Sequence, residues 1–366
     1  MKRVWMAAVM ILALVTTMAP AAQVTPIKQL SKKALEASAK AQKDPTFSEE
    51  EEYQIGADIS AKLRARYGVV QDPAIHKYIT LLGTLLAQSS DRPKLKWTFI
   101  VLDTDGINAF AAPGGFIHIT RGALALIRNE AELAGVLAHE ISHVVFKQTL
   151  IAIRDAKYEN AAGKAVKTLT RSDFVQIAMS KGYSIVFENA PSASQEQAAD
   201  AAGVTLANGV NYAPTGLSAF LQRLDDRNKG FTDRSGLFAS HPQIKDRLDE
   251  ITSLIEEQGL SSKATVQARY SRSVAYRPVA VSQMTQVPTP TETSAKAEPQ
   301  KSGLGKFGLS GLSNLGKEKP SNGTISATGS RGVNPDRDAK GGPNKALVVV
   351  TVTQPEITAF RKGIVG

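Results

Sequence analysis

The centre of the chain carries a helix-type pattern, NEAELAGVLAHEISHV, at residues 129–144. Asn129 with Glu132 three residues later is typical of a helix N-terminus, because such side chains accept from backbone N–H groups that lack a partner within the helix. Apolar residues recur every three or four positions and so share one face. They are Leu133, Val136, Leu137, Ile141 and Val144. The stretch predicts a capped amphipathic helix packed against a core.

Two histidines lie four residues apart in this helix, in the pattern His139-Glu140-Ile141-Ser142-His143. Side chains four apart share a helix face, so both imidazoles can bind one metal ion. Glu140 lies about 100° further around the helix. There its carboxylate can take a proton from a metal-bound water and pass it to a leaving amine. The alternative is an ordinary surface helix that carries two histidines.

A second acidic pair, Glu196 and Asp200, lies in the sequence EQAAD, whose small alanines favour close helix packing. A catalytic zinc takes three protein ligands and leaves one position open. Glu196 is therefore predicted as the third ligand, and Asp200 as a partner for the ring N–H of a ligand histidine. The alternative is a solvated acidic helix face.

The remaining patterns predict an α+β fold that is mainly helical and has a small β-sheet. Ser48 with Glu51 is a capping-box signal for a first helix. Residues 96–102 and 116–120 are β-prone, and a Pro-Gly-Gly turn at 113–115 precedes the second strand. Further helices are predicted within residues 48–88, 194–207, 217–224 and 244–255.

The length of 366 residues favours two domains, and a composition with 42% hydrophobic and 21% charged residues suits a soluble globular protein. Residues 261–366 hold 15 Lys or Arg against 6 Asp or Glu, so most of the formal charge of +10 belongs to this tail. Its Ser, Thr, Pro, Gly and Lys content predicts disorder. The uncharged residues 347–353 are β-prone, and either an added edge strand or local packing fits them.

The two ends of the chain also carry functional signals. Lys2 and Arg3, the apolar residues 4–18 and the small residues 19–21 are typical of a signal peptide, followed by a leader at 22–47. The alternative is an uncleaved anchor in the inner membrane, facing the periplasm.

The chain has no cysteine, which excludes disulfides and, together with the signal, suits a bacterial periplasm. Charges dispersed in the tail, with few aromatics, argue against specific nucleic-acid binding. They favour a tether or solubilising extension, through which the chain would associate with the envelope or the outer membrane.

Ordered motifs then resemble a known family. NAFAAPGG at 108–115, TRG at 120–122, the HExxH pattern, Glu196 with Asp200, His241-Pro242 and Arg247 follow one another. This order is similar to the HtpX and CAAX-prenyl-protease type of zinc metallopeptidase, over about residues 48–258. Without hydrophobic spans the chain resembles the periplasmic BepA-like and LoiP-like branch, although no helical repeat array follows.

The resemblance implies a zincin-type domain at 48–258 with one Zn²⁺ per chain. The composition of the rest predicts a low-complexity basic linker at 259–345 and a β-prone segment at 346–366. It implies an edge strand on which an extended substrate pairs through its backbone. The residues of that strand are Gly114, Gly115, Phe116, Ile117 and His118. His241 would stabilise the oxyanion or occupy the open zinc position in a latent state, and Arg247 would stabilise the oxyanion.

The function expected from these features is zinc-dependent hydrolysis of unfolded or misassembled cell-envelope proteins. The alternative is a latent peptidase that acts mainly as a periplasmic chaperone or binding module. Two further histidines receive no metal role. His76 is expected at the surface, and His118 is expected to alternate with its apolar neighbours along the strand.

Overall fold

A computed structural model describes residues 47–160, 172, 175–176, 178–179, 182–183, 191–229, 244–280 and 344–364. The predicted signal peptide, nearly all of the leader, His241 and most of the basic linker lie outside these ranges. Within them, no helix is both long and apolar enough to cross a bilayer.

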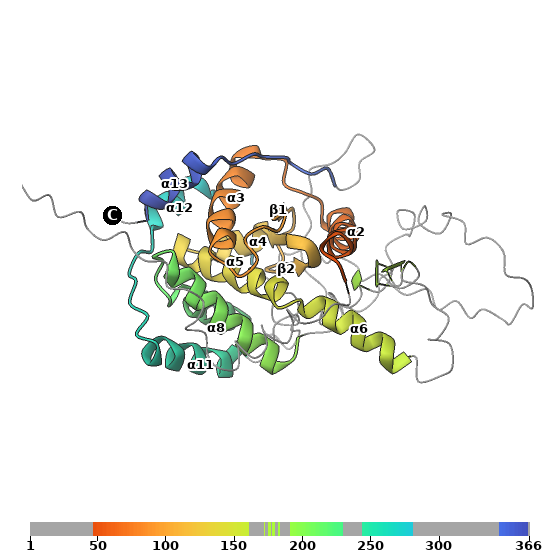
Figure 1. Cartoon of the computed structure of the whole chain (residues 1–366). Helices are drawn as coiled ribbons and strands as arrows, with labels where there is room; N and C mark the ends of the chain where they lie inside the picture. Colours follow the sequence, from red (N-terminus) through yellow and green to blue (C-terminus); the bar gives the residue numbers. More distant parts are fainter. Residues whose placement is uncertain are drawn as a thin grey trace, which may run out of the picture.

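The described part is mainly helical and contains one three-stranded sheet, as the sequence predicts (Figure 1). The strands are β1 (Thr98–Leu102), β2 (Ala109–Ala112) and β3 (Phe116–Thr120), with the short 3-10 helix η2 (Pro113–Gly115) before β3. The helices are α2 (Glu49–Tyr67), α3 (Pro73–Gln88), α4 (Arg121–Leu126), α5 (Glu130–Val145), α6 (Gln148–Asn160), α8 (Ala193–Gly209), α9 (Gly216–Asn228), α11 (Ile244–Glu257), α12 (Gln267–Ser273) and α13 (Gln354–Lys362).

The predicted helix starts are confirmed. Ser48 and Glu51 form a reciprocal capping box at α2, and the Asn129 side chain accepts from the backbone N–H of Glu132 at α5. These contacts satisfy donors that have no partner inside the helix.

The order of the sheet corrects one prediction. β3 is the central strand, parallel to β1 and antiparallel to β2, so it is not the edge strand expected from the sequence. The edge beside α5 is β2, because β2 pairs in the sheet with β3 alone. β2 was not expected because its sequence, AFAA, lacks the β-branched residues that mark strands.

The glycines before β3 allow the turn to pack closely inside this chain. Gly114 has φ of 71°, which favours glycine, and a Cβ there would lie 2.5 Å from the Cα of Tyr53 on α2. The turn is therefore packed against α2. This corrects the expectation that Gly114 and Gly115 belong to an edge strand that pairs with substrate.

Helix α5 occupies the centre of the core, and every one of its residues is buried. It packs against α8, α9, α3 and β2, and Figure 1 shows α8 running alongside it. Gly203 of α8 lies against α5, since a Cβ there would be 2.8 Å from the backbone nitrogen of His139. The absence of a side chain at 203 thus allows the two helices that carry the predicted ligands to touch.

The folded unit continues past the predicted boundary at residue 258. Leu260 and Tyr270 are buried in the main core, and so are Ile357, Phe360 and Ile364 of the C-terminal segment. Residues 344–353 form no strand, and α13 packs against α3. Within residues 260–280 and 344–364 the chain packs on the core instead of being disordered, because a few apolar residues spaced three and four apart bury well despite a polar composition.

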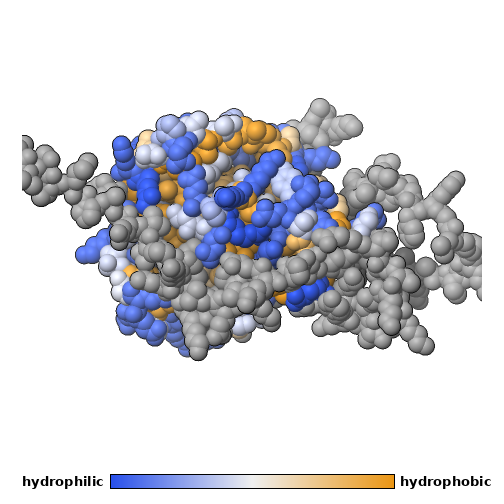
Figure 2. Space-filling view, viewed as in Figure 1, coloured by the Kyte–Doolittle hydropathy of each residue, from blue (hydrophilic) through white to orange (hydrophobic). Residues whose placement is uncertain are grey.

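The face drawn in Figure 2 mixes hydrophilic residues with apolar ones that show between them. Among the described residues, the exposed large hydrophobic side chains are Leu347 and Val349, both in the stretch predicted to be β-prone. The stretch forms no strand and packs locally, since Val348 and Val352 are partly buried against the core.

Candidate metal centre

The two histidines of α5 converge as their spacing predicts. The rings of His139 and His143 lie edge to face with centroids 4.5 Å apart. Their Nε2 atoms are 2.9 Å apart, and both side chains are buried. One turn of helix thus presents two imidazole nitrogens to the same point.

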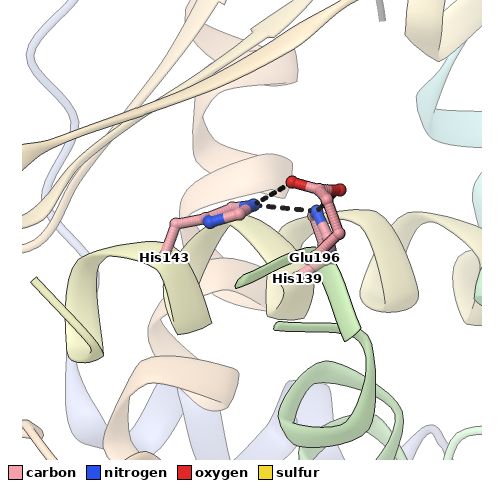
Figure 3. A group of neighbouring side chains, drawn as sticks. All are labelled: His139, His143 and Glu196. Carbon is pink, nitrogen blue, oxygen red and sulfur yellow. Dashed lines mark hydrogen bonds and ion pairs between the residues drawn. The ribbon is translucent and has the colours of Figure 1, made fainter. Parts of the chain in front are cut away.

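Glu196 reaches this point from α8. Its carboxylate oxygens lie 3.6 Å from Nε2 of His139 and 3.5 Å from Nε2 of His143. Figure 3 shows the carboxylate facing both rings across the contact between α5 and α8. A ligand atom from each of the three residues lies within 4.8 Å of the other two. The predicted ligand set is therefore brought together.

The arrangement fits a divalent metal ion. Donors bound tetrahedrally at about 2.0–2.1 Å are separated from one another by about 3.3 Å. Here the two Nε2 atoms are 2.9 Å apart, Oε2 of Glu196 lies 3.6 Å from Nε2 of His139, and Oε1 lies 3.5 Å from Nε2 of His143, all close to that value. Two imidazoles and one carboxylate form a donor set used by catalytic zinc, which keeps its fourth position open.

Asp200 lies behind His139. Its Oδ1 is 2.8 Å from Nδ1 of the ring, so the proton on Nδ1 is held there and Nε2 keeps its lone pair for a metal. Burial alone would raise the pKa of Asp200, but Arg247 and His139 outweigh burial, and the pKa falls below the usual carboxyl value. The position is the one predicted for a residue that orients a ligand histidine.

Arg247 has a different place from the one expected. Its Nε and Nη2 each donate to the Asp200 carboxylate at 2.7 Å, and Nη1 lies 2.9 Å from Oε2 of Glu196. Burial by itself would lower the pKa of Arg247. The carboxylates of Asp200 and Glu196 raise it by more than burial lowers it, so the guanidinium stays charged. Arg247 therefore binds the carboxylates that surround the metal position. These contacts are those of a residue that positions the ligands, and the role at a substrate oxyanion stays a prediction.

Glu140 is buried on α5 beside His139. Its charge is close enough to Arg247 to help raise the pKa of that guanidinium. The placement agrees with a carboxylate that works beside the metal position without being one of the three converging donors.

Two histidines outside the site were placed incorrectly. His76 is buried, and its Nε2 lies 2.9 Å from the carbonyl of Val70, whereas the sequence predicts a surface residue. His118 does not line a substrate edge: it is buried, its Nε2 lies 2.9 Å from Oγ of Ser60, and burial lowers its pKa to about 3. Every residue of β3 is buried, so alternation along the strand gave no exposed face.

One side chain at the site has no motif that could have revealed it. Gln148, the first residue of α6, contacts the ring of His143 through Oε1. Its position depends on the turn between α5 and α6, which spacing within a single helix does not predict.

Comparison with known proteins agrees with this geometry. The profile described as peptidase family M48 matches residues 73–255, which is half of the chain and includes the three converging ligands. The chain belongs to peptidase family M48.

Curated relatives of this M48 protein carry two kinds of name. "Beta-barrel assembly-enhancing protease" of Yersinia pestis is 27% identical over 213 residues, which is 56% of this chain and 44% of the relative. The protein of that name in Escherichia coli (strain K12) is 27% identical over 211 residues, 56% and 43% of the two chains. "Mitochondrial metalloendopeptidase OMA1" of Schizosaccharomyces pombe is 26% identical over 215 residues, 56% and 61%. The matched region thus spans less than half of the two bacterial relatives.

Proposed function

We propose that this M48 protein is a zinc metalloendopeptidase that hydrolyses unfolded or misassembled proteins of the bacterial cell envelope. The observation that carries the proposal is the convergence of His139, His143 and Glu196 beside the buried carboxylate of Glu140. Membership of a peptidase family supports the reaction type.

The residues of the site divide the work. His139, His143 and Glu196 would hold the metal, which when bound would supply Lewis acidity toward the peptide carbonyl and the attacking water. Glu140 accepts a proton from that water as its oxygen adds to the carbonyl carbon. It then delivers the proton to the amide nitrogen as the C–N bond breaks. Asp200 and Arg247 keep the ligands in place.

The substrate strand is proposed to pair with β2 instead of β3. β2 is the edge of the sheet, and it packs against α5, which carries the two histidines. An extended peptide added to this edge forms backbone hydrogen bonds that do not depend on side-chain identity. Broad sequence tolerance and a requirement for unfolded substrate follow from this mode of binding.

The location and the substrate class have separate support. A signal-peptide pattern at residues 1–21 favours export to the periplasm. The names of the bacterial relatives connect a matching protease region with assembly of β-barrel proteins. Both features support an envelope protease that acts on chains with unfinished folding.

Cleavage of unfolded casein by residues 22–366, with metal content measured on the same sample, tests the proposal. About one zinc per chain and cleavage that a chelator abolishes are expected. Zinc without cleavage would point to a latent enzyme or a chaperone, whereas a protein that binds no zinc would contradict the proposed site.

A further inference from the structure

The junction between α5 and α6 places a glutamine directly behind a metal ligand. Lys147, the residue before α6, has φ of 53°, an unusual backbone conformation for a residue with a side chain. Its Nζ forms an ion pair of 2.7 Å with the buried carboxylate of Glu52 on α2. The junction is thereby fixed to the rest of the fold. The next side chain, that of Gln148, turns inward and is buried.

Gln148 makes two hydrogen bonds that determine the orientation of its amide. Nε2 donates to the backbone carbonyl of Gln195 at 3.2 Å, so the amide oxygen must face the other way, toward Nδ1 of His143. An oxygen can only accept, and therefore His143 carries its proton on Nδ1. Nε2 of His143 is left with a lone pair aimed at the metal position, as a ligand histidine requires.

The same amide joins two elements that carry ligands. Gln195 directly precedes Glu196 and lies in the first turn of α8, where its own side chain caps the helix through Ser192. The Gln148 side chain therefore spans from the His143 ring to the backbone next to Glu196. Asp200 occupies the corresponding position at His139, where its Oδ1 lies 2.8 Å from Nδ1 of the ring.

We propose that Gln148 is a positioning residue of the metal centre, one that sets the tautomer and ring orientation of His143 and fixes the start of α8 beside it. The inference rests on the proposed function, because it assumes that the three converging side chains bind zinc. Gln148 does not act on substrate. Its effect passes through the affinity and geometry of the metal.

Three variants of the full chain separate these roles. Gln148→Leu removes both hydrogen bonds while keeping similar volume. Gln148→Glu keeps an acceptor for Nδ1 of His143 but loses the donor to the Gln195 carbonyl. Gln258→Leu is the matched control, since Gln258 bonds Thr205 at 3.4 Å on the distant side of α8 and touches none of the ligands.

Zinc affinity is measured by competition with a chromophoric chelator, and geometry by the visible spectrum of the Co²⁺-loaded protein. We expect Gln148→Leu to weaken zinc binding by about 10–100-fold and to change the Co²⁺ spectrum. Gln148→Glu should recover most of the affinity, and the control should match wild type. The melting temperatures of the metal-free variants report whether each one folds.

The outcomes discriminate. A folded Gln148→Leu protein with wild-type zinc affinity and an unchanged Co²⁺ spectrum would overturn the inference. If that variant does not fold, Gln148→Glu decides: affinity within about threefold of wild type supports the inference, and loss of 100-fold or more contradicts it. A wild-type chain that binds no zinc would instead overturn the proposed function itself.

Discussion

The guanidinium of Arg247 and the carboxylate of Asp200 form two parallel hydrogen bonds of 2.7 Å, both groups being buried. Such a bidentate pair is stronger and more directional than a single contact. Asp200 in turn holds His139, and Arg247 also contacts Glu196. The pair therefore links α8 and α11 to the metal position.

Replacing the arginine should destabilise the fold and the metal site together. Arg247→Met leaves the carboxylates of Asp200 and Glu196 buried without their cation, and loss of about 3–5 kcal/mol in the free energy of unfolding is expected. Urea denaturation of the metal-free protein measures this effect. A catalytic role at the oxyanion predicts the opposite pattern, with unchanged stability and zinc content and a lower kcat.

The contact between Gly203 and His139 gives a second prediction. A methyl group at 203 would lie 2.8 Å from the His139 nitrogen, so Gly203→Ala must push α8 away from α5. We expect a loss of about 1–3 kcal/mol in the free energy of unfolding, together with weaker zinc binding. Denaturation and chelator competition measure the two effects. Unchanged zinc affinity would show that the spacing of these helices does not control the site.

The tail gives a third prediction, opposite to the one its composition suggests. The Arg269 guanidinium contacts both oxygens of Glu130 at the start of α5, at 2.5 and 2.6 Å, and donates to the carbonyl of Phe360 at 2.8 Å. Tyr270 is buried beside it. A chain that ends at residue 260 should therefore fail to fold cooperatively, as judged by thermal denaturation. Full peptidase activity in that truncated chain would contradict the packing described for α12 and α13.

His118 predicts how stability depends on pH. Its pKa is about 3 in the folded chain and about 6.5 when unfolded. Below about pH 6.5 the His118 ring takes up a proton in the unfolded chain but not in the folded chain. The contribution of His118 to the free energy of unfolding is therefore complete above that pH and is lost as the pH falls toward 3. The free energy of unfolding changes through this one group by at most about 1.4 kcal/mol per pH unit.

The variant His118→Asn isolates the pH dependence that comes from His118, because it removes the titrating ring and keeps a polar group near Ser60. The unfolding free energies of wild type and variant should converge as the pH falls from 7.5 to 5, with other groups cancelling in the comparison. A constant difference across that range would show that His118 is not the titrating group.

Local patterns predict the helix that carries the histidines well, because a cap, an apolar face and a spacing of four all lie within 16 residues. Glu196 and Asp200 were likewise found by their spacing. Spacing within a helix does not predict the contacts that support the site. Arg247 could be located by resemblance, but its binding to two carboxylates depends on how α11 packs on α8. Gln148 depends on a left-handed turn at Lys147.

The errors in the fold have a similar origin. β2 consists of alanines and one phenylalanine, which carry little strand preference, and its pairing to β3 comes from the turn between them. α13 has only a few apolar residues in a polar tail, and they are stabilised by a surface on α3 far away in sequence. In both cases long-range packing decides the structure, and composition does not.

The central claim is that zinc bound by His139, His143 and Glu196 works with Glu140 to hydrolyse peptide bonds. The most direct test is casein cleavage and zinc content measured side by side for wild type, Glu140→Gln and His139→Ala. Glu140→Gln should keep about one zinc and lose cleavage, and His139→Ala should lose both. Cleavage by Glu140→Gln at the wild-type rate would contradict the account.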